Sequence, residues 1–204
     1  MNAVDFFLRL HAVVHSKRVA TAEGGWSALE SVLRDATEEE LRATPLGMTS
    51  IVWALWHIAR IEDVAANVII AGRPQVLDEG GWAERMSVPR RDVGTGMSKD
   101  DMRRLSRDVV LPALLEYRDA VGLRTREVAT TMATERWEET YGLPESRRVL
   151  DSGAIMPGME RMDKFWTGKS MSWFLYWVCA EHSVMHLSRA DVVRDLLKSS
   201  PPAE

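Results

Sequence analysis

The sequence contains one cysteine, Cys179, so no disulfide bond can form within the chain. Long apolar runs are also lacking, because charged residues or histidine interrupt each apolar stretch before the roughly 18 residues that a membrane span needs. The N-terminus has no basic segment followed by a long apolar one, which argues against a signal peptide. These absences predict a soluble cytoplasmic protein without a membrane partner.

Clusters of charge of one sign are absent as well. The 26 basic and 30 acidic side chains are interspersed and give a formal net charge of -4. Domains that bind nucleic acids usually carry a clustered basic surface, so we expect no nucleic-acid partner. With 204 residues, of which 46% are hydrophobic, the chain is expected to form a single domain over residues 1–204.

Signals for β-strands are missing too. The sequence has no convincing alternation of apolar and polar residues and no Asn-Gly or Asp-Gly hairpin turn. Apolar residues instead recur at helical spacing, first between Val4 and Arg34. Gly24 and Gly25 interrupt that region, and each glycine costs about 1 kcal/mol inside a helix, so one long helix and two short ones both stay open. A short capped helix is expected at 36–42.

A long helix is predicted after this region. Thr49 or Ser50 is a suitable N-cap for it, because a hydroxyl can accept a hydrogen bond from the first turn. Gly72 is a suitable end, because glycine readily adopts the left-handed conformation found after helices. Residues 74–96 show no periodicity and are predicted to form a loop.

Two further long helices follow from similar signals. One is predicted from Ser98 to Gly122, with a kink where Pro112 removes a backbone donor. The other is predicted at about 170–198. Within the intervening residues 123–169, a further helix at 124–139 stays open, whereas 142–169 contain two prolines and several glycines and are expected to be irregular. The fold class is therefore all-α, a four-helix bundle with a long irregular crossing between the third and fourth helices.

Three histidines in apolar helical sequence are the main chemical signal. His182 and His186 are four residues apart, so their rings share one helix face. His57 lies in the predicted helix that begins near Ser50. If these helices face each other, three imidazole nitrogens meet and leave an open coordination position, as in catalytic metal sites. The alternative is three separate core histidines that bond to backbone or water.

A second histidine pair occurs near the N-terminus. His11 and His15 also have i, i+4 spacing, but Arg9, Lys17 and Arg18 surround them. We therefore expect a mostly solvated helix face there, with metal binding as the less favoured alternative.

Several residues near the predicted centre have weaker signals. Arg189 follows His186 by three and could bind a substrate carboxylate through a two-pronged contact, or it could simply extend its charge to solvent at the helix end. Cys179 is either a fourth ligand or, by preference, a small buried hydrophobic residue. Glu62 is about 140° around the helix from His57, which indicates a supporting or surface acid. Glu181 projects to another face than the histidines.

Aromatic residues recur beside the histidines. Trp53, Trp56, Trp173 and Trp177 follow helical spacing, which indicates bundle core more than a substrate pocket.

The histidines and their context resemble a known family. The segment Ser50-x6-His57-x4-Glu62 is similar to the opening of the second helix in the DinB/YfiT-like family, and His182-x3-His186 is similar to its closing motif. The resemblance covers residues 17–197. It implies a four-helix bundle in which His57, His182 and His186 hold a divalent metal. It also implies that dimers are common and that relatives include S-transferases that use bacillithiol or mycothiol.

A metal held by three neutral nitrogens keeps its full positive charge, which acidifies a bound water or thiol. Nitrogen ligands suit several metals, of which zinc and nickel are the expected ones here. The favoured function is a metal-dependent transferase whose partners are a small thiol and an electrophile. The alternatives are a metal-dependent hydrolase and a metal-binding or interaction bundle without catalysis.

Overall fold

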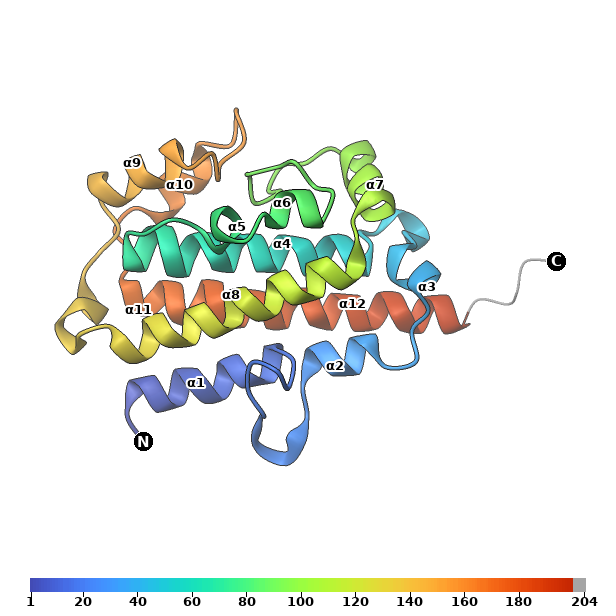
Figure 1. The fold of residues 1–204 in the computed structure, drawn as a ribbon, viewed down its shortest axis with the longest axis horizontal. Coiled ribbons are helices and arrows are strands. Elements are labelled where there is room, and N and C mark those ends of the chain that lie inside the picture. Colours follow the sequence, from blue (N-terminus) through green and yellow to red (C-terminus); the bar gives the residue numbers. More distant parts are fainter. Residues whose placement is uncertain (200–204) are drawn as a thin grey trace.

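The computed structural model in Figure 1 describes residues 1–199 and confirms the all-α class. Within this range the β-type pairing is limited to an isolated bridge between Thr140 and Ser170. The longer segments are α1 (Ala3–Val14), α4 (Ile51–Asp63) with its π-helical continuation η3 (Val64–Ala71), α7 (Lys99–Asp108), α8 (Leu111–Thr131), α9 (Leu143–Asp151), the π-helical η5 (Phe174–Glu181) and α12 (His182–Ser199). The shorter segments are η1 (Glu23–Gly25), α2 (Ala28–Leu33), α3 (Glu38–Arg42), η2 (Pro45–Gly47), α5 (Val76–Glu79), α6 (Trp82–Arg85), η4 (Thr134–Glu138), α10 (Arg161–Trp166) and α11 (Met171–Trp173).

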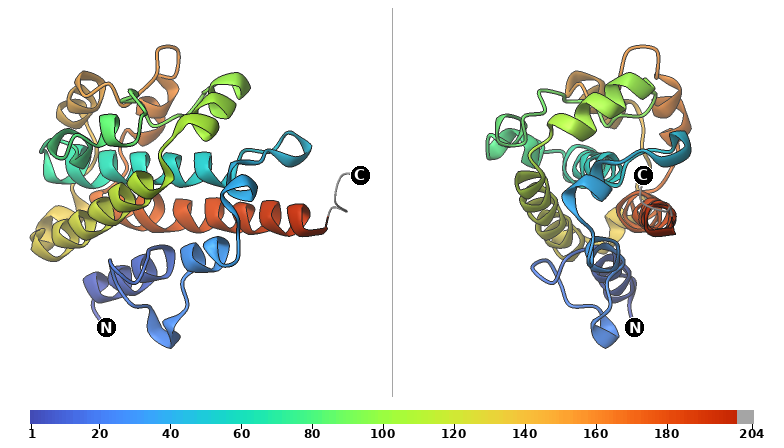
Figure 2. Two further views of the ribbon diagram at one scale, coloured as in Figure 1. Left: turned by 45° about the vertical axis from the view of Figure 1, so that its right-hand side comes forward. Right: turned by 90° about the vertical axis from the view of Figure 1, so that its right-hand side faces the viewer.

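The long helices run side by side around α4. Helices α8 and α12 both pack on α4, while α1 and α2 lie along the opposite side of α8 and α12 (Figures 1 and 2). Helices α5, α6 and α7 and the pair α9 and α10 gather on the other side of α4 (Figure 1). None of the helices in the described part of the chain is both long and apolar enough to cross a membrane.

The helix formed by α4 and η3 is enclosed on all sides. Ser50 caps it by accepting a hydrogen bond from the Trp53 amide at 2.9 Å, and Gly72 ends it in the left-handed conformation, as predicted. All side chains from 51 to 70 are buried. A helix without a solvent face must satisfy every polar side chain internally, because an unpaired polar group in the interior is costly.

The last long helix also has the predicted position. Ser170 caps it at the Trp173 amide, and α11, η5 and α12 continue without a break to Ser199. Its middle part is a π-helix, in which the His182 amide donates to the Trp177 carbonyl five residues earlier. Such π-helical turns are rare and occur often at functional sites.

The first region forms two short helices rather than one long one. Asn2 caps α1, and Ser27 caps α2. Between them, Gly24 and Gly25 both have positive φ angles, at 77° and 69°, so the chain turns where the sequence pattern was interrupted.

The helix predicted from Ser98 to Gly122 is wrong in two respects. It is two helices, α7 and α8, and Pro112 lies in the first turn of α8, where proline removes no intrahelical hydrogen bond. Gly122 does not end α8, which continues to Thr131. The glycine is needed for close packing instead, since a Cβ there would lie 2.6 Å from Nδ1 of His15.

The segments predicted to be irregular, 74–96 and 142–169, contain helices, and the end of α8 occupies part of the possible helix at 124–139. Residues 74–96 include α5 and α6, and the crossing at 123–169 includes the end of α8, η4, α9 and α10. Contacts with the bundle explain part of this helical structure. Arg148 on α9 donates to the carbonyls of Val68 and Ile69 at 3.1 and 3.3 Å, where the π-helical segment is about to end.

A buried carboxylate joins α4, α5 and α8. Asp63 accepts hydrogen bonds from the amides of Val76 and Leu77 at 2.8 and 3.0 Å, and so caps α5 from a neighbouring helix. The Tyr117 hydroxyl on α8 donates to it at 2.6 Å. Arg60 pairs with it at 3.2 Å, and both side chains are completely buried.

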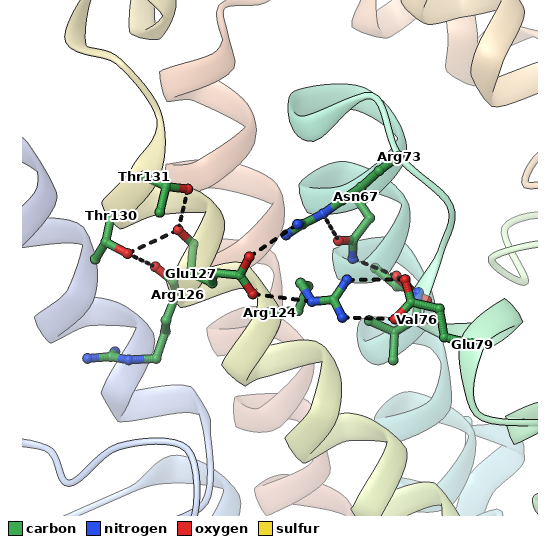
Figure 3. Close-up of polar contacts among 10 residues, drawn as sticks. Asn67, Arg73, Val76, Glu79, Arg124, Arg126, Glu127, Thr130 and Thr131 are labelled. Carbon is green, nitrogen blue, oxygen red and sulfur yellow. Dashed lines mark hydrogen bonds and ion pairs between the residues drawn. The ribbon is translucent and has the colours of Figure 1, made fainter.

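Ion pairs extend this connection to the surface. Arg124 on α8 contacts Glu79 on α5 at 2.8 Å, and Arg73 just after η3 contacts Glu127 on α8 at 3.2 Å (Figure 3). These outer pairs are partly solvated and contribute little stability, so the buried Asp63 contacts dominate the attachment of α5.

Candidate metal centre

Three histidines from two helices converge in the interior. His57 comes from α4, and His182 and His186 come from the first turns of α12. The ring centroids of His57 lie 5.1 Å from His182 and 4.8 Å from His186, and the two α12 rings are 4.5 Å apart. One ligand atom from each ring lies within 4.8 Å of the others. The structure therefore brings together the three residues that the sequence singled out.

The orientation of His57 is fixed by its surroundings. Its Nδ1 lies 2.5 Å from the Val93 carbonyl, and since a carbonyl only accepts, Nδ1–H must donate. This leaves Nε2 with its lone pair free. The indole of Trp53 stacks on the imidazole, with centroids 4.9 Å apart and planes 8° from parallel. A backbone carbonyl on the far nitrogen is the usual support of a metal-binding histidine.

The protonation states also suit a metal. Burial lowers the pKa of His57 to about 4 and that of His186 to about 3, and it lowers the pKa of His182 as well. The rings are therefore neutral at neutral pH, and only neutral imidazole offers a lone pair to a cation. Nδ1 of His182 is buried without a hydrogen-bond partner. These residues fit a divalent metal, which would bind through the ring nitrogens.

Comparison with known proteins identifies the family of the chain. A family model described as the DinB superfamily matches residues 21–189. The chain belongs to the DinB superfamily. The crystal structure of a conserved protein from Enterococcus faecalis is similar to this DinB chain, with a TM-score of 0.62 and 17% identity over 97% of this chain and 96% of that one. At that identity the likeness shows the fold alone. No curated protein matches the chain.

The loop that supports His57 in this DinB protein depends on a glycine. Gly94 follows Val93 directly and has a φ of +81°, and a Cβ there would lie 2.6 Å from the Trp56 ring. We expect Gly94→Ala to lower the free energy of unfolding more than Gly158→Ala does, by about 1–3 kcal/mol, the range for overpacking. Gly158 is the matched control because its φ is +84° but nothing lies within 4 Å of an added Cβ. Urea unfolding of both variants measures the difference, and equal losses would contradict it.

A cavity adjoins the metal centre. Its volume is about 290 Å³, and His186, Arg189 and the residues just before α4 line it. The Arg189 side chain is exposed, and within the described residues no hydrogen bond or ion pair engages its guanidinium. His186 thus faces both the other two histidines and a space with a free positive charge.

The remaining residues considered near the centre take structural positions. Cys179 is fully buried, burial raises the pKa of its thiol well above the ordinary value, and its sulfur is not among the converging ligand atoms. Trp56 is completely buried core, as predicted. Trp173 and Trp177 stack on each other with centroids 6.2 Å apart, but Trp177 is 37% exposed, so the prediction that it belongs to the bundle core is wrong. Glu181 is partly buried and lies outside the histidine group.

The prediction of a solvated His11 and His15 is wrong. Both side chains are fully buried, and both contact the carboxylate of Glu62, which is fully buried too. The basic neighbours in the sequence were misleading, because α1 is amphipathic. His11 lies on its buried face with Phe7, and His15 is the buried residue just after the helix ends. Glu62 is not a surface acid either, because every residue of α4 is buried. The sequence feature that could have predicted the burial of these histidines is the helical spacing of apolar residues from Phe7 to Val14.

Proposed function

We propose that the chain is a divalent-metal-dependent transferase that joins a low-molecular-weight thiol to a small electrophile. His57, His182 and His186 are the proposed ligands. Membership of the DinB superfamily and the convergence of these histidines indicate metal binding. The observation that carries the catalytic proposal is that this group is not sealed: His186 is part of the wall of a cavity of about 290 Å³.

When bound, a metal such as zinc or nickel would supply the positive charge that deprotonates a thiol or water. The protein residues provide the rest of the environment. Trp53 and the Val93 carbonyl hold His57 in one orientation and engage Nδ1, which leaves Nε2 as the nitrogen available to a metal. The low pKa of each ring keeps all three nitrogens free of protons at neutral pH.

The cavity indicates the class of electrophile. Its volume is at the small end of the range for ligand sites, which suits a small metabolite. Arg189 is proposed to bind an anionic group of that molecule, because a guanidinium can form two parallel hydrogen bonds to a carboxylate. Thr49 and Ser50 line the same cavity. We therefore expect a small electrophile that carries a carboxylate.

The proposal is tested with cysteine as the thiol and a chloronitrobenzoate as the electrophile. The sulfur forms a bond to the ring carbon, chloride leaves with the electrons of the C–Cl bond, and the thiol proton passes to solvent. We expect this product only when zinc- or nickel-loaded protein and thiol are both present. A rate that is the same for the metal-free protein contradicts the proposal. Thiol-independent hydrolysis of esters would instead make the protein a hydrolase, and metal binding without turnover would make it a binding protein.

Substitution of Arg189 gives a sharper prediction. We expect Arg189→Gln to raise KM for the chloronitrobenzoate about 10-fold or more, because a hydrogen bond to a charged group contributes roughly 1.5–3 kcal/mol. The KM for the chloronitrobenzene that lacks the carboxylate should not change. Arg147→Gln is the matched control, since Arg147 is exposed on α9, away from the cavity lining. An equal rise for both electrophiles would contradict the assigned role.

A further inference from the structure

A second cluster of metal-ligand side chains lies between α1 and α4. Nε2 of His11 is 2.8 Å from Oε1 of Glu62, and Nε2 of His15 is 3.2 and 3.1 Å from its two oxygens. All three side chains are completely buried. The cluster shares no residue with the three-histidine group, although Glu62 and His57 are on the same helix.

The spacing of these atoms matches adjacent ligands of one metal ion. Metal–nitrogen and metal–oxygen bonds of about 2.1 Å at right angles place two ligand atoms about 3.0 Å apart. The observed separations bracket that value, and the three ligand atoms all lie within 4.8 Å of one another. Two imidazoles and one carboxylate form the ligand set that first-row transition metals use in open facial sites.

The chemistry of the ligands fits as well. Burial lowers the pKa of His15 to about 3, so its ring is neutral at neutral pH. Burial raises the pKa of Glu62, but the interactions with His15 and His11 more than reverse this and keep the carboxylate ionised. Nδ1 of each histidine is buried without a partner, so without a metal the contacts of Nε2 with Glu62 are the hydrogen bonds that orient these rings.

We propose that His11, His15 and Glu62 form a second metal site that takes a divalent first-row transition metal such as cobalt, manganese or iron. The site goes beyond the proposed transferase function and does not depend on it. The competing explanation is a metal-free network in which buried Arg118 balances the charge of Glu62. Arg118 donates to the Val14 carbonyl at 2.6 Å, while its Nε and Nη1 have no partner.

The test uses cobalt and a background without the first centre. In His182→Ala/His186→Ala, a single histidine of that centre remains, so retained cobalt reports the second site. Because the cluster is sealed, the protein is refolded with cobalt, desalted, and analysed by mass spectrometry and visible absorption. We expect about one cobalt per chain, lost when Glu62→Gln is added and kept when Glu127→Gln is added. Glu127 is the matched control, because it is an exposed glutamate on α8.

A folded double variant that retains no cobalt overturns the second site and leaves the metal-free network. If the double variant does not fold, the full-length native sequence and its Glu62→Gln variant provide the comparison. There we expect two bound metals to fall to one, and an unchanged metal content overturns the proposal. If the three-histidine group does not bind metal, the result is different: the native sequence and the His182→Ala/His186→Ala variant then have the same metal content.

Discussion

His182→Ala is expected to abolish retention of zinc or nickel at the three-histidine centre. Two of the three proposed ligands would remain, and they come from different helices. Loss of a group that only supports a ligand typically lowers metal affinity 10–100-fold, so we expect loss of a ligand itself to lower it by more than about 100-fold. Competition with a chromophoric chelator measures this affinity, and mass spectrometry after desalting gives the stoichiometry.

The control for this variant is on the same helix. Met185→Ala removes a side chain that is 38% exposed and adjacent to His186, but that offers no ligand in the converging group. Its affinity should match that of the native sequence. His57→Ala should lose the metal as His182→Ala does, because His57 supplies the third nitrogen. Unchanged affinity in either histidine variant would leave three separate core histidines in place of a metal centre.

Asp63→Asn is expected to lower the free energy of unfolding by about 3–5 kcal/mol, the range for breaking one side of a buried ion pair. The amide keeps the size of the side chain but removes the charge that balances buried Arg60. It also replaces one of the two accepting oxygens by a donor. Oδ1 accepts from the Val76 amide, and Oδ2 accepts from the Leu77 amide and the Tyr117 hydroxyl, so in either orientation the new NH2 group faces a donor. Urea unfolding followed by circular dichroism measures the loss.

Asp78→Asn is the matched control for Asp63→Asn. Asp78 pairs with Arg91 at 2.7 Å, but both side chains are partly exposed, at 32% and 51%. Ion pairs of that kind contribute about 0–1 kcal/mol, so this variant should be nearly as stable as the native sequence. If Asp63→Asn also loses less than about 1 kcal/mol, the buried network does not hold α5 in place.

The sequence was sufficient for the parts of the fold that depend on local signals. Ser50 and Gly72 marked the ends of the central helix, and the i, i+4 spacing of His182 and His186 fixed their common face. His182 and His186 can converge with His57 only if their two helices pack together. The apolar composition of both helices predicted this packing.

The second cluster could not be found in this way, because it depends on packing between distant segments. Glu62 was correctly judged to point away from His57, but that direction leads to α1 and not to solvent. The relevant fact is that α4 has no exposed residue, so each polar side chain on it requires a partner from another helix. The prediction that Gly122 ends a helix is wrong for a related reason. The glycine allows the close approach of His15, and this contact between distant segments leaves no local sequence pattern.

The π-helical segments η3 and η5 have a consequence for how the bundle can vary in length. A π-turn closes its hydrogen bond over five residues, one more than an α-helical turn, so it accommodates an additional residue without interrupting the helix. His57 precedes η3 in the chain and His182 follows η5, and these two segments pack together at one end of the bundle. We therefore expect that residues inserted or deleted at that end can be absorbed by the π-turns, while the register of His57 and His182 is preserved.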